Sequence, residues 1–344
     1  MTEQMKEKLP EVTTVYIALA AIMLILFITI CGCASKSSAE TPDIEFIDIE
    51  VDIEVENLLS IEQAVFVAGT NNIIINAGSE WELEGILTLP EGTGPFPLVV
   101  IVHGSGQARK NRYHDLTNFL AEQGVASIRH DKRPTAYPEI AQDVSFTLKE
   151  ESVDDALSAV ALAKTIQTIN QDMIFVLGHS QGGFLIPIIH EGDKEDMIAG
   201  FISLAGGARP FVEHLKELVE MGVMDDLEIE VYEDDIKNLL AGADLDENYR
   251  IADQYPAYWL YLADYDPVKS AKNIDKPILF MQGADDNLLL PDNLDMWKLA
   301  TQNNQKAVYR FYPELDHFFR KLNSAFIEEE VVIDIAEFIK SQYK

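Results

Sequence analysis

One serine in the sequence stands in a pattern that prepares a side chain for nucleophilic attack. Gly178-His179-Ser180-Gln181-Gly182 has the form GxSxG, and it follows the apolar run Met173–Leu177 and precedes a helical pattern. Between a strand and a helix, such a turn strains the serine backbone and lifts the hydroxyl above the sheet. Glycines are needed on both sides because larger side chains would collide with neighbouring backbone. The pattern therefore predicts Ser180 as a nucleophile.

A serine hydroxyl is a weak nucleophile, so a base and an acid that orients the base are expected later in the chain. His317 follows the last predicted strand, where it would take the Ser180 proton and return it to the leaving group. The acid follows a late strand as Asp285 or Asp286, and position alone leaves both open. Asp316 is a poor orienter despite its proximity, because adjacent side chains diverge along an extended segment.

The oxygen that becomes negative during acyl transfer needs two N–H donors. The first is the backbone N–H of Gln181, at the start of the helix after the serine. The second is expected in a glycine-containing turn after an early strand, where Ser105 is the preferred donor and Gly104 the alternative. His103 in the same turn is expected to brace the loop beside the substrate pocket, since one base suffices for the reaction.

The sequence predicts neither a metal nor a cofactor. The remaining histidines form no pair with metal-ligand spacing. The two cysteines, Cys31 and Cys33, both stand at the end of the one long apolar run, so no disulfide or cysteine-based zinc site is expected in the core.

The elements that must position these residues follow a regular alternation. Fully apolar runs alternate with helical patterns, which indicates a mostly parallel sheet buried on both faces. The expected buried strands are Leu98–Val102, Val125–Ile128, Met173–Leu177, Ile198–Leu204, Ile278–Met281 and Val308–Tyr312. The expected helices are Asp115–Gln123, Val153–Ile169, Gly182–Ile189, Asp292–Gln302 and Phe326–Ser341. Two further strands, Gln63–Val67 and Trp81–Leu89, are expected before them.

A long segment from about Ala208 to Asp266 interrupts this alternation and keeps helical apolar spacing, which predicts a helical lid inserted between strands. Open α/β sheets bind ligands at the carboxyl ends of their strands, so the lid is expected to shape the pocket there. Tyr258 and Trp259 are its candidate pocket residues. Two alternatives stay open: these side chains only hold the lid down, or the insertion is a surface excursion with no part in catalysis.

The net charge limits the partners of the chain. Its 58 acids and 26 bases give a formal net charge of -32, and this field repels nucleic acid and anionic lipid. Residues 34–60 begin with a small-polar linker and continue with acids alternating with Ile or Val. We interpret this segment as an acidic tether ahead of one globular body at residues 61–344.

The first 33 residues form an export or anchor segment. Val12 to Ile30 carries no charge over 19 residues, close to the roughly 20 that span a bilayer as a helix. The following Cys31-Gly32-Cys33 resembles a bacterial lipoprotein cleavage box, with Cys33 as the lipid-bearing residue. A lipidated Cys33, an uncleaved transmembrane anchor and ordinary cleavage all remain possible, and each places the body outside the cytoplasm.

With these motifs the sequence resembles the α/β-hydrolase superfamily, within it Ser-dependent esterases similar to dienelactone hydrolases and prolyl-oligopeptidase-like hydrolases. The resemblance covers about Val65 to Tyr343. It rests on the GxSxG turn and on the runs HGSG at 103–106, SIRHDKRPT at 127–135, YWLYLADYDP at 258–267 and QGADDNLLLP at 282–291. Pro134 stands where this branch usually carries a glycine after DKR.

The resemblance implies the α/β-hydrolase fold with a mostly parallel central sheet, flanking helices and a lid. It implies Asp286 as the triad acid, because the family's acid falls three residues after the glycine. The expected activity is cleavage of a small-molecule carboxylic ester through an acyl-enzyme. A peptidase, acyltransferase or thioesterase on the same triad is the alternative, and an inactive binding protein is a third hypothesis. The sequence indicates no oligomeric state.

Overall fold

The computed structural model describes residues 66–223, 226–243, 249–251, 254–263 and 265–343, and all statements below concern these residues. The apolar run, Cys33 and the acidic tether lie outside them, as do the expectations placed on them. Within the described ranges, no helix is long and apolar enough to cross a bilayer.

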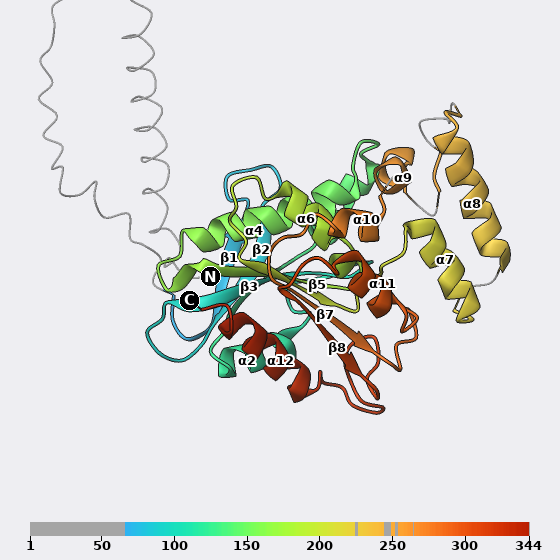
Figure 1. Ribbon diagram of the computed structural model, residues 1–344. Coiled ribbons are helices and arrows are strands. Elements are labelled where there is room, and N and C mark those ends of the chain that lie inside the picture. Colours follow the sequence, from blue (N-terminus) through green and yellow to red (C-terminus); the bar gives the residue numbers. More distant parts are fainter. Residues whose placement is uncertain (1–65, 224–225, 244–248, 252–253, 264, 344) are drawn as a thin grey trace, which may run out of the picture. The chain divides into compact units, whose positions relative to one another are not determined.

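Eight strands form one sheet in the order β1-β2-β4-β3-β5-β6-β7-β8 (Figure 1). The pairs β1–β2 and β2–β4 are antiparallel, and the other five pairs are parallel. The strands are β1 Gly69–Ile75, β2 Leu83–Leu89, β3 Phe96–Val102, β4 Ala126–His130, β5 Ile169–His179, β6 Gly200–Leu204, β7 Ile278–Gly283 and β8 Ala307–Tyr312. Because β3 to β8 are parallel, their carboxyl ends meet at one edge, and the predicted site residues follow those ends.

Burial explains why these segments form strands. Every residue of β4, β6 and β7 is buried, as expected for parallel strands covered on both faces. The edge strands β1 and β8 expose several residues each.

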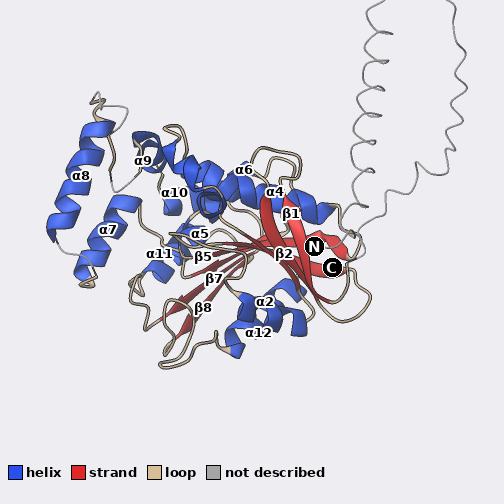
Figure 2. Ribbon diagram, turned by 180° about the vertical axis from the view of Figure 1, so that it is seen from behind, coloured by secondary structure: helices blue, strands red, loops and turns tan. Residues whose placement is uncertain are grey.

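Helices cover both faces of the sheet (Figure 2). One face carries α2 His114–Glu122 and α12 Glu329–Lys340, which pack together on Val99, Ile101 and Phe175. The other face carries α4 Asp155–Lys164, α6 Ile186–Gly192, α10 Pro267–Ala271 and α11 Asn293–Ala300. Shorter elements are α3 Arg133–Ala136, α5 Gln181–Phe184, the 3₁₀ turn η2 Pro138–Gln142 and the π-helical turn η3 Lys149–Asp154.

The insertion between β6 and β7 is helical, as the sequence predicts. It contains α7 Phe211–Glu220, α8 Asp226–Leu240 and α9 Pro256–Ala263. In Figure 1 these three helices lie together at one end of the sheet.

Several expected elements differ from the observed bounds, and two of these differences have a clear physical reason. The first strand begins at Gly69, and the described end of the predicted strand Gln63–Val67 is not a strand. The Asn71 side chain bonds both the N–H and the carbonyl of Val67, which closes a local turn there. The helix expected over Val153–Ile169 ends at Lys164, because Ile169 already pairs with Phe96 in the sheet.

Candidate active site

Ser180 occupies a strained turn between β5 and α5. Its φ of 55° and ψ of -117° lie where non-glycine residues are rare. A Cβ on Gly178 would come within 2.2 Å of the Gly182 carbonyl, and one on Gly182 within 2.4 Å of the Val102 carbonyl oxygen. The N–H of Ser180 donates to the Leu204 carbonyl at 2.9 Å, which ties the turn to β6. Both flanking glycines are therefore required by close backbone contact.

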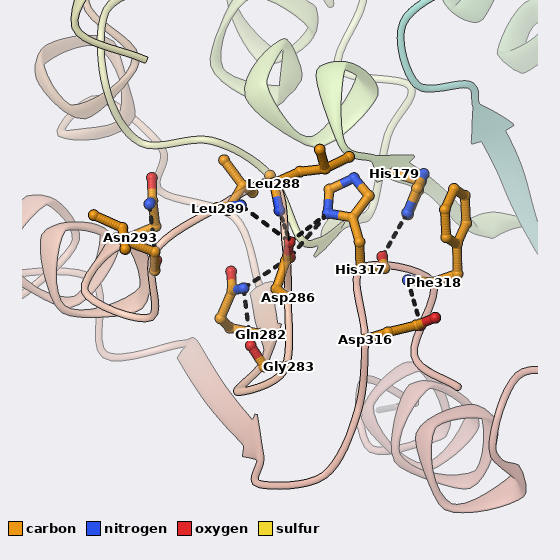
Figure 3. A network of polar contacts seen from close by, with 12 residues as sticks. His179, Gln282, Gly283, Asp286, Leu288, Leu289, Asn293, Asp316, His317 and Phe318 are labelled. Carbon is orange, nitrogen blue, oxygen red and sulfur yellow. Dashed lines mark hydrogen bonds and ion pairs between the residues drawn. The ribbon is translucent and has the colours of Figure 1, made fainter. Parts of the chain in front are cut away.

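Asp286 and His317 form a buried pair at the ends of β7 and β8 (Figure 3). The Nδ1 of His317 lies 2.8 Å from Oδ2 and 3.0 Å from Oδ1 of Asp286. Oδ1 also accepts the N–H groups of Leu288 and Leu289, and Oδ2 accepts the Gln282 side chain. With Nδ1–H donating to the carboxylate, Nε2 of His317 keeps its lone pair and is available as a base.

The two competing acids lie away from the imidazole. Asp285 is exposed, and its N–H donates to the Leu315 carbonyl at 3.0 Å. The carboxylate of Asp316 binds the Arg320 guanidinium at 3.0 and 3.1 Å. The geometry therefore brings only Asp286 of the three candidates to His317.

His179 connects the serine turn to the histidine loop. Its Nε2 lies 2.9 Å from the His317 carbonyl oxygen, and its Nδ1 lies 2.8 Å from the Tyr113 hydroxyl. Burial, with a smaller contribution from His317, lowers the pKa of His179 to about 3. The neutral ring therefore donates through Nε2 and accepts through Nδ1.

The segments predicted to carry the N–H donors lie beside the serine. Ser105, Ser180 and Gln181 all line one cavity. Gly104 packs so closely that a Cβ on it would lie 3.2 Å from the Ser180 Cβ. The backbone of Gly104 also bonds the Tyr113 hydroxyl, whose pKa is raised chiefly by burial. Because the Gly104 backbone already bonds Tyr113, the N–H of Ser105 is the favoured second oxyanion donor.

The cavity beside Ser180 has a volume of about 210 Å³ and a mostly apolar wall. The lid helix α7 contributes four side chains to it, the lid helix α9 contributes Leu262, and the others come from outside the lid helices. The lining residues are Ser105, Leu148, Ser180, Gln181, Phe184, Gly207, Phe211, His214, Leu215, Leu218, Leu262 and Leu289. The insertion thus takes part in the site.

The three side chains predicted to line the pocket are not on this wall. His103 is buried behind the loop, with Nε2 2.6 Å from the His130 carbonyl, and burial lowers its pKa well below the usual value. Tyr258 is buried against the Gln181 side chain. Trp259 donates from Nε1 to the Ile251 carbonyl at 2.8 Å and packs on Phe211. The apolar spacing of Tyr258 and Trp259 reflects packing of the lid, an alternative that the sequence left open.

Two buried charged residues near the site are not singled out by the sequence analysis. Glu217 of α7 accepts the Leu290 N–H at 2.7 Å and an N–H of the Asn293 side chain, and it pairs with Arg209. Lys132, after β4, pairs with Glu151 in η3. Glu217 stands between Lys216 and Leu218, and Lys132 lies in a loop without periodicity, so the sequence pattern marks neither residue as buried. Among the described residues, no three His, Cys, Asp or Glu side chains gather as a metal site requires.

Comparisons with known proteins show similarity to hydrolases. The family described as "Serine aminopeptidase, S33" matches residues 93–223. Esterase EstD of Thermotoga maritima is 28% identical over 246 residues, which make up 68% of this chain and 57% of the esterase. The chain therefore spans less than two thirds of that relative.

Solved structures with a similar fold have low sequence identity. Est1E from Butyrivibrio proteoclasticus is 18% identical with a TM-score of 0.52, over 79% of this chain and 98% of that one. The acylaminoacyl peptidase of Pyrococcus horikoshii is 16% identical with a TM-score of 0.57, over 81% of this chain and 43% of that one. With this sheet order, this serine turn and these similarities, the chain has the α/β-hydrolase fold and is similar to hydrolases that share it.

Proposed function

We propose that this protein is a serine hydrolase that cleaves carboxylic esters through an acyl-enzyme intermediate. The observation that carries the proposal is the buried Asp286–His317 pair, which lies 2.8 Å apart at the same sheet edge as the strained Ser180. The similarity to an esterase of Thermotoga maritima supports it.

In the first half-reaction the Ser180 hydroxyl oxygen attacks the ester carbonyl carbon while its proton passes to Nε2 of His317. The carbonyl oxygen becomes negative and accepts the N–H groups of Gln181 and Ser105. The intermediate then breaks its bond to the alcohol oxygen, and His317 returns the proton to this leaving group. The acyl group stays on Ser180 as an ester.

In the second half-reaction a water molecule replaces the alcohol. Its proton passes to Nε2 of His317 as its oxygen attacks the acyl carbon, and the collapse of the second intermediate returns a proton to Ser180. The products are one alcohol and one carboxylic acid. Asp286 keeps the imidazole in the tautomer with a free Nε2 and stabilises its charged form.

The wall of the cavity favours an uncharged acyl group over the amino terminus of a peptide. An aminopeptidase substrate carries a charged amine, which requires an acidic partner when it is buried. The described wall holds seven apolar side chains of Leu and Phe and no Asp or Glu. We therefore place an apolar acyl chain in this cavity, with peptide hydrolysis as the competing hypothesis.

Covalent labelling tests the mechanism. A fluorophosphonate probe should add one label to the wild-type protein and none to Ser180→Ala, as read by intact mass. Ser105→Ala is the matched control, because it removes the other serine hydroxyl of the cavity and keeps the backbone N–H. Labelling that persists in Ser180→Ala would overturn the proposal. Turnover of aminoacyl anilides in preference to acyl esters would favour the peptidase.

We also propose that the hydrolase acts outside the cytoplasm on a membrane tether. The support is the uncharged run from Val12 to Ile30, which precedes Cys33, and the polar, acidic segment over residues 34–60.

A further inference from the structure

The ammonium group of Lys132 lies behind both segments that carry the proposed oxyanion donors. Lys132 follows β4, and only 3% of it is exposed. Its Nζ donates to the Gly104 carbonyl oxygen at 3.1 Å and to Oε1 of Gln181 at 3.3 Å. Its third partner is the carboxylate of Glu151. All three protons of the ammonium group therefore have an acceptor.

The contact with Gly104 fixes the direction of a donor. The Gly104 carbonyl and the Ser105 N–H belong to one planar trans peptide, so they point in opposite directions. A glycine on one side lets such a peptide rotate easily. Holding the carbonyl toward Lys132 therefore turns the Ser105 N–H the other way. In the flipped peptide a carbonyl oxygen would face the developing negative charge and repel it.

The contact with Gln181 acts on the second donor. Gln181 begins α5, and its side chain is held by Lys132 and by the buried hydroxyl of Tyr258. The backbone N–H of the same residue is the other oxyanion donor. One ammonium group thus connects the two donors, which come from different strand ends.

The charge of Lys132 is balanced locally. Glu151 is 8% exposed and forms the ion pair from η3, so the buried pair has no net charge. A balanced pair contributes little field at a distance, and its effect on the reaction comes from hydrogen-bond direction.

We propose that Lys132 is a positioning residue that orients the oxyanion donors of Ser105 and Gln181. This inference rests on the proposed ester hydrolysis. The donors act on the transition state more than on the bound ester, so losing their orientation lowers kcat and leaves KM nearly unchanged.

The test compares two adjacent buried ion pairs. Lys132→Met should lower kcat on a short acyl ester by about 10- to 100-fold, less than or equal to the loss of one oxyanion donor. Arg133→Met is the matched control, because Arg133 forms a buried pair with Asp155 but contacts neither donor segment. It should lower the melting temperature with less than about a threefold change in kcat.

A double variant separates positioning from stability. Lys132→Met leaves Glu151 as a buried unpaired charge, and Lys132→Met/Glu151→Leu removes that charge. The melting temperature should recover in the double variant while kcat stays low. A kcat that recovers together with the melting temperature would overturn the inference.

An ester in which sulfur replaces the carbonyl oxygen tests the oxyanion donors directly. Sulfur accepts hydrogen bonds weakly, so the ratio of kcat/KM for an oxoester over the matched thionoester reports how well the donors act. This ratio should fall in Lys132→Met and stay at the wild-type value in Arg133→Met. An unchanged ratio in Lys132→Met would reject the positioning role. A wild-type protein without ester turnover or phosphonate labelling would instead reject the proposed hydrolysis itself.

Discussion

The backbone carbonyl of His317 accepts a hydrogen bond of 2.9 Å from the imidazole of His179, the residue immediately before Ser180 (Figure 3). The loop after β8 is thereby held to the turn after β5. Because Nδ1 of the same ring accepts the Tyr113 hydroxyl, only the neutral imidazole satisfies both contacts. The position of the proposed base therefore depends on a second histidine that takes no part in proton transfer.

This arrangement predicts a loss of stability in acid. Burial lowers the pKa of His179 to about 3 from an ordinary value of 6.5. Between these values the unfolded chain binds a proton that the folded chain does not, so stability rises with pH and is lost as pH falls from 6.5 toward 3. His179→Gln should make the slope of unfolding free energy against pH shallower by up to about 1.4 kcal/mol per pH unit. Urea unfolding at several pH values from 4 to 7 measures both slopes, and equal slopes would contradict the assignment.

The two neighbouring aspartates should differ sharply in their effect on catalysis. Asp286→Asn should lower kcat by about 10⁴-fold, since the amide supports the wrong imidazole tautomer. Asp285→Asn should change kcat by less than about threefold, because its side chain is exposed and its contact with Leu315 uses the backbone. Steady-state kinetics on one ester decides it. A larger loss in Asp285→Asn would move the acid by one residue.

The lid should control acyl-chain length through α7. Leu218 lines the cavity of about 210 Å³, so Leu218→Trp should reduce kcat/KM for long acyl esters more than for acetate. Trp259→Ala is the contrasting variant, because Trp259 is buried and bonds the Ile251 carbonyl. It should lower the melting temperature with an unchanged ratio between long and short esters. A chain-length shift in Trp259→Ala alone would reverse these roles.

The proposed membrane tether has its own test. Cys33→Ser should prevent lipidation and leave an unprocessed chain, whereas Cys31→Ser should barely alter processing. Mass spectrometry of the mature amino terminus in a bacterial host measures this. An intact Met1 with the apolar run retained in the wild type would show a transmembrane anchor instead.

The parallel part of the fold follows from the sequence because burial on both faces leaves apolar runs without alternation. All six expected buried strands overlap β3 to β8. The site residues could be placed for the same reason: Ser180, Asp286 and His317 each follow one of those runs, and the runs end at one edge. Choosing Asp286 over its neighbour Asp285 as the triad acid needed the family resemblance, because spacing alone does not show which side chain points toward the histidine.

The pocket wall could not be predicted in the same way. Trp259 and Leu218 both stand at apolar positions of lid helices, and periodicity does not tell a side chain that packs on the core from one that faces a cavity. Lys132 was missed because its role depends on Gly104 and Glu151, which are distant in sequence. Such contacts exist only once the loops after β3 and β4 and the turn η3 are in place.

The hydrogen bond from the Leu290 N–H to Glu217 bears on whether the cavity can widen for a long acyl chain. Glu217 belongs to α7, and Leu290 belongs to the loop that carries Asp286. Moving α7 aside would strip a buried carboxylate of its partners, Arg209 and Asn293 among them, at a cost of about 1 to 3 kcal/mol for each group left unsatisfied. The helix α7, which lines the cavity, is thus held to the loop that carries the proposed acid, and we expect it to resist displacement. For the proposed ester hydrolysis, we therefore expect an acyl chain that is longer than the cavity to be excluded from the site.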